Sequence, residues 1–263
     1  MTAPLDSNLP LWALPVLFAT GLVAGFVDSI AGGGGLITLP VLLNLGIPPQ
    51  FALGTNKLQA TFGSGSAAWH YAHHRLVSLP ECLRGVIWTG LAAAAGSFVI
   101  LQLEKHVPGI VKQIIPWMLL AVAAFVFFKP KFGDADVHPR MSAGWFYAVA
   151  GISLGFYDGF IGPGTGTFWT MALMLGLGFN LTKATGYTKV MNVASNAASL
   201  AVFICSGQLY YGAGLCMGIG QLLGARVGSR LVVARGTKFI RPIFLTMVLA
   251  LTLKLLFDLY LKK

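Results

Sequence analysis

Charge is scarce in this sequence, and negative charge is scarcest. Charged residues make up 10% of the 263 positions, with eight Asp and Glu against 18 Lys and Arg. An average soluble domain carries about 25% charged residues. Hydrophobic residues account for 56% of the chain, and its mean hydropathy is +0.76. This balance excludes an ordinary soluble domain, so we predict an all-α integral membrane protein whose solvent is the lipid bilayer.

Cysteine is also rare. Cys82, Cys205 and Cys216 are odd in number, widely spaced and set among apolar residues. This pattern indicates neither a disulfide framework nor a metal site, and no other motif implies a cofactor. The first ten residues contain Asp6 but no Lys or Arg, so we expect no cleaved signal peptide. The excess of basic residues lies at the ends of apolar runs, which indicates membrane orientation and excludes a nucleic-acid partner.

Apolar runs separated by short polar breaks extend along the whole chain. They lie near 11–30, 34–46, 51–72, 80–102, 111–128, 142–161, 165–178, 182–205, 209–232 and 240–261. A span needs about 20 residues, which predicts a polytopic protein with eight to ten transmembrane segments. The loop "KPKFGDADVHPRM" at 129–141 is rich enough in Pro, Gly and charge to be a linker between a first transmembrane repeat, 11–128, and a second, 142–261.

Three blocks of the first half recur in the second half in the same order. They are "GFVDSIAGGGG" with "GFYDGFIGPGT", "ALGTNK" with "ATGYTK", and "AAAAGS" with "GARVGS". The first block matches Asp28 with Asp158, and the second matches Lys57 with Lys189. Each half holds five runs, or three crossings if its first two runs form a re-entrant hairpin. Both numbers are odd, so the sequence predicts two repeats of inverted topology.

Glycines interrupt the start of each repeat. Residues 32–35 are four glycines in a row, and "GPGTG" at 162–166 is the matching stretch. Glycine costs about 1 kcal/mol against alanine in a helix, and non-helical backbone in a bilayer is tolerated only around a cavity or inside protein. We therefore predict broken or re-entrant helices and, in each repeat, one polar hole whose freed N–H groups attract an anion. Close helix packing through glycine is the alternative interpretation.

Asp28 and Asp158 lie in otherwise apolar segments, where a carboxylate costs roughly 2.5–3.5 kcal/mol. Lys57 and Lys189 are the only basic residues that recur at matched positions within the apolar segments. We predict two Asp–Lys pairs, formed within each repeat or crossed between the repeats. The aspartates would then serve gating or coupling, or the pairs would be neutralised struts that fix helix packing.

Backbone N–H groups, an ammonium group and side-chain amides together suit a small oxyanion. We predict the substrate-binding residues Gly32, Gly33, Gly34, Gly35, Asn56, Lys57, Gln59, Gly162, Gly164, Thr165, Lys189, Asn192 and Asn196. Neighbouring hydroxyls are secondary candidates, namely Thr55, Ser64, Thr188 and Ser195.

The stretches "GFVDSIAGGGGLITLP", "ALGTNKLQA", "GFYDGFIGPGTG" and "GQLLGARVGSRLV" resemble the sulfite exporter TauE/SafE family of bacterial membrane transporters, in particular its YfcA-type branch. The resemblance covers nearly the whole chain. It implies a transporter in the bacterial inner membrane that exports a small sulfur oxyanion, sulfite or an organosulfonate, and no enzyme. The family's glycine motifs map to Gly32–Gly35 and to Gly162 and Gly164, and the second copy departs from the first at Pro163 and Thr165.

An inside-negative potential favours anion export by about 2.3 kcal/mol per charge per 100 mV, so no coupling ion is required. Transport of another small organic anion with proton coupling is the alternative. The two ends of the predicted spans differ in basic residues, and the richer end carries Arg75, Lys129, Lys131, Arg140, Lys183, Arg226, Arg230, Arg235, Lys238 and Arg241. By the positive-inside rule that end is cytoplasmic and both termini are outside.

The segment "GSGSAAWHYAHHR" allows an enzymatic interpretation. Ser66 and His70 are four residues apart, as a serine–base pair of a membrane-embedded hydrolase could be on a helix. No orienting group or oxyanion loop accompanies them, which makes this a lower-ranked alternative. His70, His73 and His74 could also bind a metal, but histidines at the end of a span indicate an interfacial position instead.

Gly220, Gly224 and Gly228 recur every four residues and predict a smooth strip for close helix contact. Packing within the chain is the simpler interpretation of this strip. A homodimer is the other.

Overall fold

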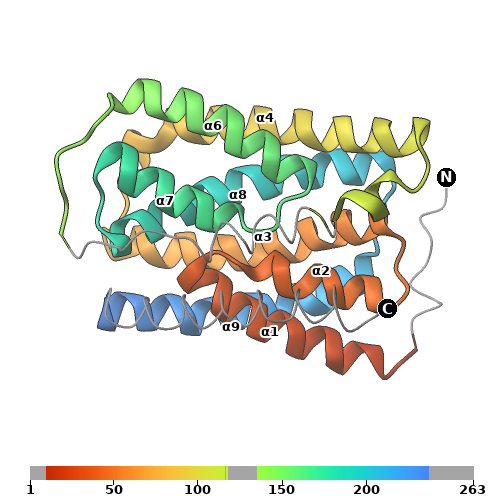
Figure 1. Cartoon of the computed structure of the whole chain (residues 1–263). Helices are drawn as coiled ribbons and strands as arrows, with labels where there is room; N and C mark the ends of the chain where they lie inside the picture. The colour runs from red at the N-terminus through yellow and green to blue at the C-terminus, as the bar shows by residue number, and fades with distance from the viewer. Residues whose placement is uncertain (1–9, 116, 118–134, 237–263) are drawn as a thin grey trace.

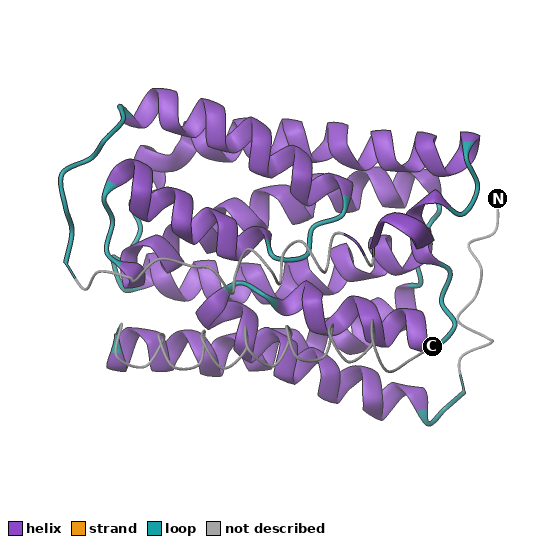
Figure 2. Cartoon of the chain, viewed as in Figure 1, coloured by secondary structure: helices purple, strands orange, loops and turns teal. Residues whose placement is uncertain are grey.

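The structure, a computed structural model, describes residues 10–115, 117 and 135–236. Eight helices lie wholly within these residues: α1 (Ala13–Ala31), α2 (Gly34–Asn44), α3 (Pro49–His73), α4 (Leu79–His106), α6 (Ala143–Phe160), α7 (Thr165–Leu177), α8 (Leu181–Ser206) and α9 (Tyr211–Arg235). The described residues contain no strand (Figure 2), so the all-α prediction is confirmed for them. The predicted runs 111–128 and 240–261 lie largely or wholly outside the described residues.

Three described helices, α1, α4 and α8, are long and apolar enough to cross a membrane. Large apolar side chains such as Leu91, Phe98 and Val227 are more than half exposed, as expected of a surface that faces lipid. The helices α2 and α7 are apolar but have only 11 and 13 residues, which corresponds to about 16–20 Å. Each is therefore shorter than the hydrocarbon core of about 30 Å.

The central helices of the bundle are α3 and α8, which pack against each other and run in opposite directions (Figure 1). On one side α9 packs against α3, and α1 lies along α9. On the other side α4 packs against α8, and α6 lies along α4. Helices of the first half therefore make the same contacts as the helices that match them in sequence in the second half.

Glycines allow the outer helix pairs to approach closely. A Cβ atom on Gly228 of α9 would collide with the carbonyl oxygen of Phe26 of α1. The matching Gly96 of α4 lies in the same way against the carbonyl oxygen of Phe156 of α6. Since Gly220 and Gly224 also contact α1, the predicted packing of this glycine strip within the chain is confirmed. Association of two copies stays a prediction.

Candidate functional site

Two glycine turns connect the short helices to the long helices before them. The helix α1 ends at Ala31, Gly32 adopts a left-handed φ of 77°, and α2 begins at Gly34. Between α6 and α7, Gly162 and Gly164 adopt φ values of 95° and 83°. These positions need glycine, because a left-handed conformation is strained for a residue with a Cβ atom.

The two turns meet in the middle of the molecule. A Cβ atom on Gly166 would lie only 2.7 Å from the Cα atom of Gly32, so the two backbones are in contact. Thr167 strengthens this contact by donating a hydrogen bond of 3.0 Å to the carbonyl oxygen of Ala31. In Figure 1, the α1–α2 hairpin and the α6–α7 hairpin extend from this junction toward opposite ends of the molecule.

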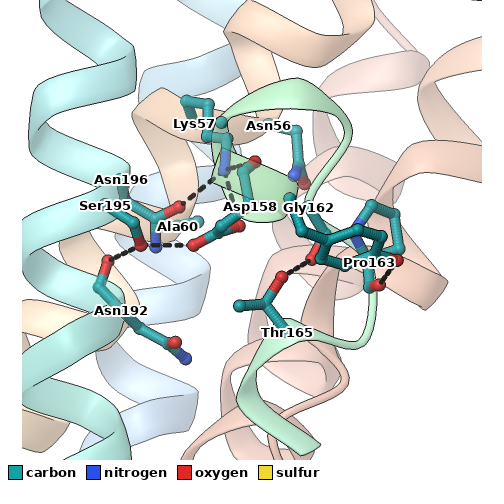
Figure 3. A network of polar contacts seen from close by, with 12 residues as sticks. Asn56, Lys57, Ala60, Asp158, Gly162, Pro163, Thr165, Asn192, Ser195 and Asn196 are labelled. Atoms are coloured by element: carbon teal, nitrogen blue, oxygen red, sulfur yellow. Dashed lines mark hydrogen bonds and ion pairs between the residues drawn. The ribbon is translucent and has the colours of Figure 1, made fainter. Parts of the chain in front are cut away.

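Lys57 of α3 is fully enclosed beside the second turn (Figure 3). Its Nζ atom lies 2.7 Å from Oδ1 of Asp158, 2.6 Å from the carbonyl oxygen of Asp158 and 3.3 Å from Oδ1 of Asn196. These three acceptors match the three N–H donors of an ammonium group. The other carboxylate oxygen of Asp158 accepts a hydrogen bond from the hydroxyl of Ser195.

Lys189 of α8 makes the matching contact with the first turn. Its Nζ atom lies 3.0 Å from Oδ2 of Asp28, while Oδ1 of Asp28 accepts a hydrogen bond of 3.1 Å from the N–H of Gly34. The aspartate therefore occupies part of the positive N-terminus of α2. The prediction of two Asp–Lys pairs is confirmed, and the structure decides between the two arrangements: the pairs are crossed between the halves.

A small cavity of about 30 Å³ lies between the two turns. Its wall includes these predicted residues: Asp28, Gly32, Gly35, Asn56, Lys57, Asp158, Gly162, Gly164, Thr165, Asn192 and Asn196. We expected one polar hole in each repeat, and in this the sequence-based expectation was wrong, because the two turns touch and line the same cavity. The cavity has room for about two waters, so it would have to widen to admit a four-atom oxyanion.

Four of the predicted residues are absent from the wall of this cavity: Gly33, Gly34, Gln59 and Lys189. Gln59 lies behind Asn56, because its Nε2 donates a hydrogen bond of 2.8 Å to Oδ1 of Asn56. Because Oδ1 of Asn56 already accepts this bond, Asn56 can offer its Nδ2 group to the cavity as a donor. Lys189 forms an ion pair with Asp28, which is itself part of the wall.

Two amide oxygens on the cavity wall have no hydrogen-bond partner among the described residues. They are Oδ1 of Asn192 and Oε1 of Gln221, and both atoms are buried. A primary amide that turns over presents N–H donors in place of the oxygen, so these side chains can serve either a water or an anion. The cavity wall therefore offers a water or an anion two amide groups whose oxygens have no partner in the described part of the chain.

Sequence reasoning missed three residues of the wall, namely Ala60, Gly166 and Gln221. Of these three residues only Gln221 has a polar side chain. The comparison of the two repeats did not indicate it, because Thr89 occupies the matching position in the first half. A lone amide on an otherwise apolar and glycine-rich stretch of α9 is the signal that could have identified it.

The alternative pair of Ser66 and His70 is not hydrogen-bonded in the described part of the chain. The hydroxyl of Ser66 donates instead to the carbonyl oxygen of Leu222 at 3.2 Å, and Nε2 of His70 has no partner there. Within the same residues, no group of three or more His, Cys, Asp or Glu side chains could hold a metal ion.

Comparison with known proteins gives consistent matches. The family model described as sulfite exporter TauE/SafE matches residues 17–255. A "probable membrane transporter protein" of Haemophilus influenzae is 43% identical over 245 residues, which cover 93% of this chain and 95% of the relative. The "probable membrane transporter protein ORF9" of Sinorhizobium sp is 44% identical over 252 residues, which cover 95% of this chain and 95% of the relative. The "probable membrane transporter protein YfcA" of Escherichia coli K12 is 40% identical over 245 residues, which cover 93% of this chain and 90% of the relative. No solved structure matches.

Proposed function

The chain belongs to the sulfite exporter TauE/SafE family, and we propose that it is a secondary transporter that exports a small anion across the bacterial inner membrane. Sulfite or an organosulfonate is the proposed substrate. The observation that carries this proposal is the polar cavity between the two glycine turns, which combines a buried ammonium group with unused amide groups. Membership in a family of transporters favours transport over catalysis.

We propose further that the halves 11–128 and 142–261, joined by the linker 129–141, are inverted repeats. The crossed Asp–Lys pairs and the matching contacts of Gly96 and Gly228 support a two-fold relation between them. The opposite directions of the α1–α2 and α6–α7 hairpins support the re-entrant alternative for the short segments. An inverted pair of hairpins meeting at mid-membrane is the arrangement in which many secondary transporters bind their substrates.

In the proposed mechanism, the anion binds where the two turns touch. The donors are Nδ2 of Asn56, the amides of Asn192 and Gln221, and the ammonium group of Lys57. The cavity is closed in this conformation, so alternating access would part the two turns toward one side of the membrane and then toward the other. Export would proceed down the electrical gradient, which is worth about 2.3 kcal/mol per charge per 100 mV.

One observation favours a second candidate, in which a proton moves with the anion. All three donors of Lys57 are engaged, and two carboxylates balance the two buried ammonium groups, so the closed site has no net charge to offer an anion. Protonation of Asp158 would remove the negative charge beside the cavity and release a donor of Lys57. Proteoliposomes that carry a pH-sensitive dye and an organosulfonate in their lumen separate the two candidates. A sulfonate group does not take up protons near neutral pH, so only the coupled mechanism changes the luminal pH during its flux.

Flux from proteoliposomes loaded with radiolabelled sulfite tests the function itself. We expect proteoliposomes with the wild-type protein to release sulfite faster than protein-free vesicles loaded in the same way. The double variant Lys57→Gln/Lys189→Gln should lose this faster release. Lys183→Gln is the matched control, because Lys183 is a lysine of the same helix as Lys189 but lies at the surface. Unchanged flux in the double variant would contradict the proposed role of the two lysines.

A further inference from the structure

A second pocket lies at one end of the α3–α9 pair. It has a volume of about 470 Å³. Its wall combines the end of α3, with Trp69, His70, His73 and the following His74, and the last turns of α9, with Arg226 and Arg230. No acidic side chain forms part of this wall.

The arginines of this pocket are not neutralised by the protein as described. Arg226 and Arg230 are four residues apart, so they project from the same face of α9. Neither takes part in an ion pair within residues 10–115, 117 and 135–236, whereas Lys183 on α8 lies 3.6 Å from Asp136. Two guanidinium groups on one helix face repel each other unless an anion lies between them.

His70 adds a ring nitrogen to which nothing in the described protein is hydrogen-bonded. The residue is only 6% exposed, and its Nε2 atom is buried without a hydrogen-bond partner there. The ring of His74 lies 4.2 Å from the ring of His70, and His73 lies 5.6 Å from His74, which gathers the imidazoles on one side of the pocket. A buried nitrogen without a hydrogen-bond partner destabilises the protein, so a ligand that bonds to it relieves this cost.

We propose that this pocket binds a phosphate-type oxyanion, carried either by the headgroup of an anionic phospholipid or by free inorganic phosphate. Guanidinium groups bind phosphate oxygens through paired hydrogen bonds, and an imidazole supplies a further donor. Trp69 is 68% exposed beside the pocket, a position typical of the bilayer interface. The pocket lies at the end of the bundle that the charge distribution predicts to be cytoplasmic, where basic pockets between helices bind lipid headgroups. The inference does not depend on the transported substrate.

The test uses the full-length protein in phosphatidylcholine nanodiscs with and without phosphatidylglycerol. Native mass spectrometry measures the retained lipid, and the melting temperature is followed while sodium phosphate is added to discs without phosphatidylglycerol. The test variant is Arg226→Gln/Arg230→Gln. The matched control is Arg84→Gln/Arg140→Gln, which removes the same charge from two exposed arginines outside the pocket.

For the headgroup source, we expect the wild type and the control to retain phosphatidylglycerol and the test variant to bind it about thirtyfold more weakly. For the free-anion source, phosphate raises the melting temperature of the wild type and the control but not that of the test variant. The inference is overturned if the test variant and the control behave alike with both probes. Arg226→Lys/Arg230→Lys keeps the charge and loses the paired hydrogen bonds, so equal binding by this variant and the wild type would also contradict a built site.

Discussion

At the scale of single residues, two buried lysines link the halves of the chain. Lys57 and Lys189 are almost completely enclosed, and each lies beside an aspartate of the other half, at 2.7 and 3.0 Å. Removing one member of such a pair leaves a buried charge without a partner, which costs more than removing both. The pairs therefore have a structural role besides the proposed functional one, and a variant must separate these two roles.

A double-mutant cycle on Lys57 and Asp158 separates them. We expect Lys57→Gln and Asp158→Asn each to lower the free energy of unfolding by about 3–5 kcal/mol, and the double variant to be more stable than either. Flux should be lost in Lys57→Gln and in the double variant, because both lack the ammonium group. Unfolding in mixed micelles measures these free energies. The control is Lys183→Gln, at the surface, which should lower the free energy of unfolding by less than about 1 kcal/mol. Wild-type flux in the double variant would assign the pair a purely structural role.

The sequence comparison matched Asp28 with Asp158 and Lys57 with Lys189, but it did not identify which aspartate pairs with which lysine. An alignment of two repeats shows which positions are equivalent, and it leaves open which equivalent residues touch. The crossing of the pairs arises from the contact between the two turns, which depends on tertiary packing. For the same reason Gln221 was missed, since its role depends on the position of α9 beside α3 and not on any repeated motif.

At the scale of helices, the length of each apolar run predicted most of the described structure. The predicted run 182–205 corresponds to α8, Leu181–Ser206, and the predicted run 165–178 to α7, Thr165–Leu177. The glycine stretches also fall where α1 and α6 end. Periodicity could not show that the two turns meet, because they are about 130 residues apart in a chain whose local pattern is uniformly apolar.

The glycine turns provide a prediction with an internal control. Gly32 and Gly46 have φ values of 77° and 80°, but a Cβ atom on Gly32 would clash with the second turn, while Gly46 has open space. We expect Gly32→Ala to lower the free energy of unfolding by about 2–5 kcal/mol and Gly46→Ala by about 1–2 kcal/mol. Flux should be lost in Gly32→Ala only. Equal effects of the two substitutions would indicate that contact between the turns has no special importance.

At the scale of the whole molecule, matched positions of the two halves should lie on opposite sides of the membrane. Arg75 follows α3 and Gly207 follows α8, and both are exposed with left-handed φ values of 57° and 68°. We expect a cysteine at position 75 to react only from the cytoplasmic side and a cysteine at position 207 only from outside, in a background without Cys82, Cys205 and Cys216. A membrane-impermeant maleimide on intact cells and on inverted vesicles measures this. Labelling of both positions from the same side would exclude inverted repeats.

The central claim is that one cavity, shared by the two glycine turns, binds the transported anion. The most direct measurement is an experimental structure determined with selenite, the heavier congener of sulfite, using the anomalous signal of selenium. We predict one selenium peak per chain between Gly32 and Gly162, within hydrogen-bond distance of Asn56 or Lys57, in a cavity wider than the present one of about 30 Å³. Selenite transport by the same preparation, together with a peak elsewhere or no peak in this cavity, would contradict the claim.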